Sequence, residues 1–405
     1  MPALCAVLGV LVLGIGLLDV FLTTLNYDES GFLVARLCRI QWCVLRALTR
    51  RLPQRWRAVI LRQAVGLSLV LNLTVWLGAV VVGFGLIYLS QMHGANFDYG
   101  GRDLGNGPFS AMYFSAAQLS TVGTGQISPQ TDGLRALSIV ETLTGLGLVT
   151  LILSFLFGVF QVVRDLRTLS SNLAAGTEAN PIISLGPYLA RAESDCLVNH
   201  LRAISISFWS YVDGLRQHHL AYYFQSGRDQ FALPYVLHIL GHWLAGLRWG
   251  LPVDHPASAI PLLTQLISQF EHLTDQLPGE LGRASAPAPR SVSFECFSSA
   301  RCAAEQTTNL WLGRFLRLER EMARMAGVEL AADPREAHER YRQWLAFAYR
   351  ADLMTAAVSR DLDYRPLLPA GHPALPHAPR LDGEPGQTSA RIGKRASRRP
   401  VRMAE

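Results

Sequence analysis

The stretch Ser120-Thr121-Val122-Gly123-Thr124-Gly125 lies between a short apolar segment and a long one, and its glycines alternate with β-branched residues. Glycine adopts left-handed backbone conformations at little cost. A glycine at every second position therefore lets successive backbone carbonyls point toward one axis. The sequence predicts a loop whose main-chain oxygens, rather than its side chains, form the principal binding groups.

The residues before this stretch predict a short helix. Pro108 stands at a favourable helix start, because the first turn does not need its missing N–H group. A helix of about eleven residues rises roughly 16 Å, about half the thickness of a bilayer. The segment from Pro108 to Leu119 is therefore too short to span a membrane and suits a re-entrant helix. Its C-terminal end, the negative end of the helix dipole, would favour a cation.

With its flanking segments, the stretch resembles the selectivity filter of the tetrameric potassium channels, which usually reads Thr-Val-Gly-Tyr-Gly-Asp. The resemblance covers about residues 66–163, with a pore helix before the filter and an inner helix at 134–163 after it. Gly145 lies 20 positions beyond Gly125, where the inner helix of this family often carries a gating hinge. The resemblance implies an ion-binding filter acting through backbone carbonyls, with the Thr121 hydroxyl as an innermost ring. Its residues would be Thr121, Val122, Gly123, Thr124 and Gly125.

Two residues depart from the family pattern. Thr124 stands where an aromatic ring usually packs the filter against the pore helix, and Gln126 replaces the usual aspartate. Both changes keep the carbonyls but remove packing that fixes their spacing. We therefore expect a cation channel that conducts K⁺, with two alternatives: a non-selective channel that also passes Na⁺, and a non-conducting membrane receptor or scaffold. The supporting pore positions are Gln118, Ser120, Gln126 and Glu141.

Composition and apolar runs predict an all-α membrane protein. Half of the residues are hydrophobic and 17% are charged. Residues 4–25 contain one charge, Asp19, and residues 64–89 contain none, so with the inner helix we expect three transmembrane helices plus the re-entrant helix. A signal peptide is the alternative for residues 4–25, but no basic residue precedes this run and it is long. Asp19 and Glu141 lie inside spans, where we expect each to make a structural hydrogen bond.

Arginines set the expected orientation. Eight of them lie between residues 26 and 62, whereas residues 90–133 contain Arg102 and Arg135 follows just beyond. The positive-inside rule places the 26–62 segment and the C-terminal region in the cytoplasm and the pore loop outside, in the cell's inner membrane. Apolar residues recur at helical spacing from Phe32 to Leu48. This segment suits the membrane interface, with its arginines on anionic lipid, or else forms a solvated linker helix.

The remaining domain organisation follows from composition. We expect an N-terminal part at 1–63, a pore domain at 64–163, a linker at 164–190, a helical cytoplasmic domain at 191–365 and a disordered basic tail at 366–405. Helical patterns lie near Leu201, Leu266, Phe315 and Trp344. The phosphate-binding G-x-G-x-x-G motif is absent from the sequence. The tail is either a solvated terminus or a segment that meets anionic lipid or nucleic acid; we expect no nucleic acid partner.

The chain carries one filter motif. Because an axial pathway needs rings of carbonyls, the resemblance implies a homotetramer. We find no combination of nucleophile, base and oxyanion donors that would indicate an enzyme, and no regularly spaced arginine helix that would indicate voltage sensing. The pairs His238/His242 and Cys196/His200 are spaced like metal ligands, but two ligands make no closed site, and we expect ordinary packing. We expect no cofactor apart from the permeant cation.

Overall fold

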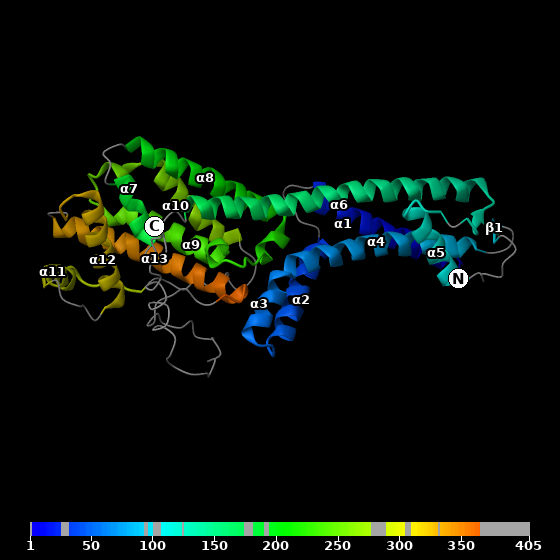
Figure 1. Cartoon of the computed structure of the whole chain (residues 1–405), viewed down its shortest axis with the longest axis horizontal. Helices are drawn as coiled ribbons and strands as arrows, with labels where there is room; N and C mark the ends of the chain where they lie inside the picture. The colour runs from blue at the N-terminus through cyan, green and yellow to red at the C-terminus, as the bar shows by residue number, and fades with distance from the viewer. Residues whose placement is uncertain are drawn as a thin grey trace, which may run out of the picture. The chain divides into compact units, whose positions relative to one another are not determined.

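The computed structural model describes residues 2–25, 32–92, 96–99, 107–123, 125–173, 181–189, 194–276, 289–303, 309–330 and 333–364. Within these ranges the chain is predominantly helical, which confirms the predicted all-α class (Figure 1). The two strands, β1 (Phe97–Asp98) and β2 (Ser128–Pro129), have two residues each and pair antiparallel. Thr124 and the predicted tail at 366–405 lie outside the described residues.

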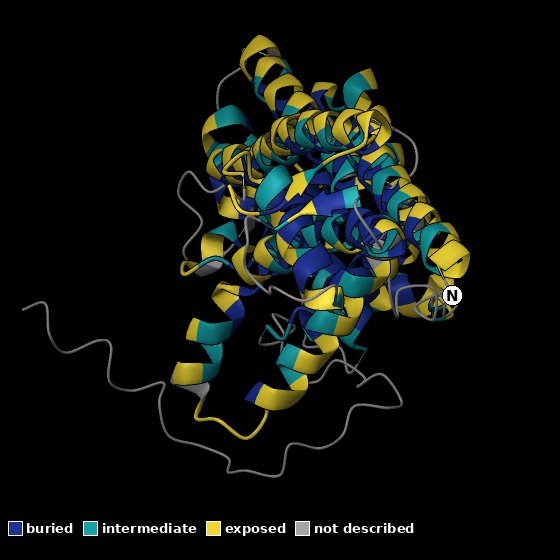
Figure 2. Cartoon of the chain, turned by 90° about the vertical axis from the view of Figure 1, so that its right-hand side faces the viewer, coloured by how far each residue is buried: buried dark blue, intermediate teal, exposed yellow. Residues whose placement is uncertain are grey.

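Among the residues that the structure describes, three helices are long and apolar enough to cross a membrane: α1 (Pro2–Leu25), α4 (Ala64–Gln91) and α6 (Asp132–Leu173). They correspond to the three predicted spans. Exposed residues cover the outer faces of the helices, and buried residues gather between them (Figure 2). Many of the exposed side chains on these three helices are large and apolar, as expected of surfaces that meet lipid or another chain.

Glycines and one buried carboxylate join α1 to α4. A Cβ atom added at Gly9 would lie 2.7 Å from the backbone oxygen of Gly83, so this contact has no room for a larger residue. The Asp19 carboxylate, which is only 4% exposed, accepts a hydrogen bond from the Trp76 indole at 2.9 Å. Because an unpaired charge within a span is costly, this bond gives Asp19 the structural role that we expected.

Helix α5 (Pro108–Leu119) lies where the sequence predicts the short pore helix and packs against both α4 and α6. Aromatic rings fix its position: Phe114 meets Tyr88 of α4 and Phe97 of β1 edge to face, with centroids 4.9 and 5.6 Å apart. Strand β2 follows the 121–125 loop, and Pro129 pairs with Phe97. The segment that holds the loop is therefore anchored on both sides.

Helix α6 extends without a break from the predicted span into the C-terminal region, past the boundary that we expected at residue 163. Its last turns pack against α8 (Ser194–Gln217). A Cβ atom at Gly158 would lie 2.1 Å from His218 Nε2, and one at Gly214 would lie 2.5 Å from a methyl group of Val162. These close contacts attach the C-terminal helices directly to the helix that carries the predicted pore.

The C-terminal region consists of α-helices joined by short 3₁₀ and π turns. The elements after α6 are η2 (Pro181–Leu185), α7 (Gly186–Leu189), α8, η3 (His219–Tyr223), η4 (Asp229–Phe231), α9 (Leu233–Ala245), the π-helix η5 (Gly246–Gly250), η6 (Pro256–Ala259), α10 (Pro261–Gln276), α11 (Phe294–Ala303), α12 (Leu310–Ala326) and α13 (Pro334–Asp361). Predicted helical patterns coincide with α8, α10, α12 and α13, whereas α7, α9 and α11 were not predicted.

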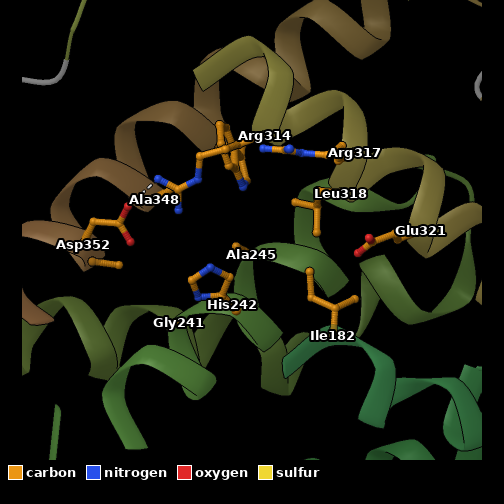
Figure 3. A pocket seen from close by; sticks show the side chains of 12 residues that line it. Ile182, Gly241, His242, Ala245, Arg314, Arg317, Leu318, Glu321, Ala348 and Asp352 are labelled. Atoms are coloured by element: carbon orange, nitrogen blue, oxygen red, sulfur yellow. Dashed lines mark hydrogen bonds and ion pairs between the residues drawn. The ribbon is translucent and has the colours of Figure 1, made fainter. Parts of the chain in front are cut away.

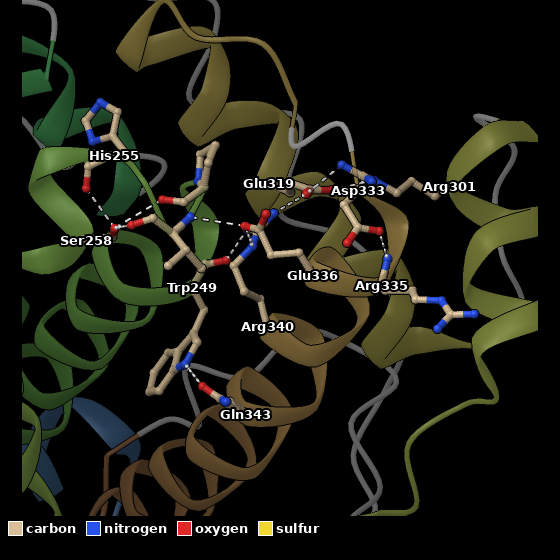
Figure 4. Close-up of polar contacts among 12 residues, drawn as sticks. Trp249, His255, Ser258, Arg301, Glu319, Asp333, Arg335, Glu336, Arg340 and Gln343 are labelled. Atoms are coloured by element: carbon tan, nitrogen blue, oxygen red, sulfur yellow. Dashed lines mark hydrogen bonds and ion pairs between the residues drawn. The ribbon is translucent and has the colours of Figure 1, made fainter.

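A buried charge network joins α11, α12, α13 and η5 (Figure 4). The Arg340 guanidinium donates to Glu319 at 2.8 Å and to the backbone oxygen of Trp249 at 2.7 Å, and it lies 3.4 Å from Glu336. Arg301 donates to both carboxylate oxygens of Glu319, at 3.0 and 3.2 Å. Arg340 and Glu319 are almost fully buried, so each depends on the other for compensation.

The N-terminal segment meets the end of α13 through α2 (Phe32–Thr49) and α3 (Gln54–Arg62). The last carbonyls of α13 have no partners within the helix. The Trp42 indole donates to Asp361 O at 3.0 Å, and Arg46 donates to Arg360 O at 2.7 Å. Asp363 forms ion pairs with Arg46 and with Arg57. We name these contacts the α2–α13 contact; they place two of the predicted lipid-facing arginines against protein.

Candidate functional site

The loop after α5 is held against the end of that helix. The Thr121 amide donates to Gln118 O at 3.0 Å, and the Gly123 amide donates to Ala117 O at 3.1 Å. These bonds satisfy carbonyls that the last turn of α5 leaves without helical partners. The loop therefore begins at a fixed position beside the negative end of the α5 dipole.

Left-handed backbone conformations recur at every second residue of the loop. The φ angles are 60° at Thr121, 72° at Gly123 and 59° at Gly125. The glycines adopt them without strain, whereas a β-branched residue such as Thr121 is strained there. The two glycines thus have the conformation that allows successive carbonyls to face one side, while Thr124 between them lies outside the described residues.

The loop is open on the surface of the single chain. Val122 is 81% exposed, and a Cβ atom added at Gly123 or Gly125 would meet nothing within 4 Å. The carbonyls of residues 121–123 and 125 accept no hydrogen bond from another described residue. Because backbone carbonyls are strong acceptors, these oxygens are available to coordinate a cation.

A buried carboxylate lies behind the loop and links α4, α5 and α6. Glu141 is fully buried, and its Oε1 accepts a hydrogen bond from the Ser115 hydroxyl at 2.5 Å. The same hydroxyl lies 3.0 Å from the backbone oxygen of Val81, and the Tyr88 hydroxyl is also beside the carboxylate. The hydrogen bond from Ser115 gives Glu141 the structural role that we expected, with α5 as its partner. Arg135 instead lies 3.4 Å from Asp132.

Gly145 lies at a close contact between α6 and the end of α5. A Cβ atom added there would lie 2.4 Å from the backbone oxygen of Leu119 and 2.9 Å from its Cδ1. Leu119 is the last residue of α5, and only Ser120 separates it from the 121–125 loop. Helix α6 is unbroken at Gly145, so the structure gives this glycine a packing role, while the hinge remains a prediction.

The other predicted pore residues surround the loop at different depths. Gln118 is half-buried, and its backbone oxygen accepts from Thr121 and, at 3.4 Å, from the Thr142 hydroxyl. The Ser120 hydroxyl donates to Ala117 O at 3.1 Å, and Gln126 is exposed. Sequence reasoning missed Ser115. Its signal was a hydroxyl in an otherwise apolar short helix, opposite a carboxylate inside a span.

An apolar stripe on α6 has no partner among the described residues. Its members recur every three or four positions and thus share one face of the helix. The side chains are between 47% and 69% exposed: Ile139, Leu143, Leu146, Val149, Leu153, Phe157 and Phe160. Together with the open loop, this stripe forms a surface that the single chain leaves uncovered.

Comparison with known proteins agrees with this geometry. An uncharacterized membrane protein of Bacillus subtilis (strain 168), YdjJ, is 28% identical over 179 residues, which cover 43% of this chain and 50% of that protein. The match therefore spans about half the length of that relative. No solved structure matches the chain. A family model described as "Ion channel" matches residues 75–162, which contain α5, the loop and most of the apolar part of α6, so this segment is similar to an ion-channel module.

Proposed function

We propose that four copies of this chain form a potassium channel in which ions pass along the axis shared by their 121–125 loops. The observation that carries the proposal is the left-handed conformation at Thr121, Gly123 and Gly125 in a loop with open carbonyls. Rings of such oxygens replace the water shell of a cation. One chain supplies only one side of each ring, so the pathway requires assembly.

The uncovered stripe on α6 supports assembly. A row of leucine, isoleucine and phenylalanine side chains that runs along α6 beside the loop suits contact between copies and the lining of the pathway. Fourfold symmetry is the state implied by the resemblance to potassium channels. The arginines of the 26–62 segment support an inner-membrane orientation with the 121–125 loop outside and the C-terminal helices in the cytoplasm.

Ion selectivity gives the first prediction. In a planar bilayer with mostly K⁺ on one side and mostly Na⁺ on the other, at equal total salt and with some K⁺ on both sides, the purified chain should carry a current whose reversal potential lies close to the K⁺ equilibrium potential. Gly123→Ala should abolish the current, because its φ of 72° is unfavourable for alanine. Gly107→Ala is the matched control, since φ there is −92° and a Cβ atom meets nothing within 4 Å.

Two other outcomes would contradict potassium selectivity. A reversal potential near zero would identify a non-selective cation channel, in which the threonine at position 124 leaves the filter loose. The absence of current from a chain that assembles normally would favour the receptor or scaffold. Assembly is measured independently, as the mass of the detergent complex by light scattering.

A membrane-facing surface on α2 and α3 extends the proposal to lipid. The buried face of α2 packs against α4 and η3 and also makes the α2–α13 contact, whereas the opposite side exposes large apolar residues. Arg50, Arg51 and Arg62 are exposed nearby. Because α3 leads into the span α4 through the single residue Gln63, this surface lies next to the bilayer and suits anionic headgroups. The exposed apolar residues are Ile40, Val44, Leu48, Trp56 and Val59.

Trp56 tests the contact with lipid. In vesicles containing anionic lipids brominated near the headgroup, Trp56→Phe should remove part of the bromine quenching of tryptophan fluorescence. Trp209→Phe is the matched control, because Trp209 is similarly exposed, 47% against 56%, but lies on α8. Removing Trp209 should instead reduce quenching by iodide in the water. Unchanged bromine quenching in Trp56→Phe would favour the solvated linker helix.

A further inference from the structure

A cavity of about 200 Å³ lies within the C-terminal helices, between α9, α12 and α13, with η2 at one end (Figure 3). Its volume is below the range of roughly 300–1,000 Å³ that is usual for drug-sized ligands, so it suits a molecule of a few heavy atoms. Small side chains make the room, since Gly241, Ala245, Ala348 and Ala351 all line it. Trp344 adds an apolar wall.

Helix α12 presents charged side chains to this cavity from one face, at positions 314, 317 and 321. Arg314 donates to Asp352 of α13 at 2.6 Å through Nη1 and lies over the Trp311 ring at 4.6 Å. These contacts compensate its charge but leave its other guanidinium N–H groups free to donate. In Figure 3, Arg314 and Arg317 lie on the same side of the cavity, with Asp352 and Glu321 at opposite ends.

Arg317 lines the cavity with a side chain that is exposed to solvent. Its side chain makes no hydrogen bond or ion pair with another described residue. Two guanidinium groups on one side of a small cavity, only one of them paired, favour an anion between them. A planar oxyanion group accepts from guanidinium donors in matching geometry.

His242 supplies an acceptor on the opposite side. It points from α9 toward the cavity, and its Nδ1 lies 2.8 Å from the backbone oxygen of His238. A carbonyl only accepts, so Nδ1 carries the proton and Nε2 keeps its lone pair. Burial lowers the pKa of His242, which keeps the ring neutral near pH 7. Nε2 can therefore accept a hydrogen bond from a hydroxyl or amino group.

We propose that this cavity binds a small organic acid, with its carboxylate held by Arg314 and Arg317 and a hydroxyl or amino group donating to His242. The apolar body of the ligand would lie against Trp344 and the small residues of α9 and α13. An acid of about six heavy atoms, such as lactate, matches this volume and these donors and acceptors. The site differs from the conduction loop in position and in chemistry.

Titration calorimetry on the full chain in detergent tests the site, with lactate as the probe and the neutral amide lactamide as its isostere. Lactate should bind saturably, and Arg317→Ala should weaken binding about tenfold or more, since it removes a charge-assisted hydrogen bond. The control Arg320→Ala removes an exposed arginine of α12 that does not line the cavity and should leave the affinity unchanged. Because Arg317 is exposed, its variant should keep the thermal midpoint of the parent.

Each of four results would overturn the proposal. The first is no saturable lactate binding to the folded chain up to about 10 mM, a concentration that would detect even weak millimolar sites. The second is equal affinity in Arg317→Ala and Arg320→Ala. The third is equal binding of lactamide. The fourth is binding of inorganic phosphate alone, which would indicate a simple anion site. Ion flux plays no part in these measurements, so they stand apart from the proposed channel activity.

Discussion

Gly145→Ala should reduce K⁺ flux from liposomes by about tenfold or more, because the added methyl group would overlap the end of α5. Its carbon would lie 2.4 Å from Leu119 O, whereas ordinary contacts begin at 3.4 Å, so the helices would have to separate by about 1 Å. The overlapping atom belongs to the backbone of Leu119, which only Ser120 separates from the 121–125 loop, and cannot rotate away. The displacement is therefore transmitted to the loop carbonyls.

Gly147→Ala is the matched control for this prediction. It lies two residues further along α6, and a Cβ atom there meets nothing within 4 Å. Both substitutions raise the helix propensity of α6 by nearly the same amount, about 1 kcal/mol. If stiffening of a hinge were the main effect, the two variants would behave alike. Normal flux through Gly145→Ala would show that α5 and α6 are less closely packed than the structure has them.

The helical class and the spans were predictable from sequence because they depend on local patterns. The apolar run of α1 contains a single charge and that of α4 contains none, and α12 and α13 each carry apolar residues at helical spacing along one face. Helix α9 escaped prediction because nearly all of its residues are buried, which leaves no polar face to reveal a period. The glycine alternation likewise predicted the left-handed positions at Gly123 and Gly125.

Contacts between distant residues were not predictable. The sequence marked Glu141 as a costly charge within a span but left its partner open, because Ser115 comes near only once α5 folds back against α6. Gly145 could be read as a hinge, since spacing along one helix does not show what lies beside it. Arg46 and Arg57 counted as lipid-facing arginines, yet Asp363 pairs with both from more than 300 residues away.

A substitution at Arg340, in the buried charge network, should cause the largest loss in the free energy of unfolding. Arg340→Met keeps much of the volume but removes the donor to Glu319 and to the backbone oxygen of Trp249. Breaking a buried pair from one side typically destabilises by roughly 3–5 kcal/mol. Arg301 still pairs with Glu319 in the variant, which places the expected loss near 3 kcal/mol. For a region of this size, that corresponds to a decrease of roughly 6–12 °C in the unfolding midpoint.

Arg342→Met is the matched control, because it removes an arginine whose ion pair is exposed to solvent. Arg342 also forms an ion pair, with Glu339 at 3.0 Å, but both side chains are more than half exposed. Exposed pairs of this kind contribute little, so its midpoint should stay within about 2 °C of the parent. The midpoints are measured by thermal unfolding of the full chain in detergent, monitored by tryptophan fluorescence. Trp249 lies in the network, so its fluorescence reports on this region. Equal midpoints for the two variants would mean that water reaches Glu319 and Arg340 and that the network is not buried. A double variant, Glu319→Gln with Arg340→Met, should be no more stable than Arg340→Met alone, because the carboxylate that it removes still pairs with Arg301 in the single variant.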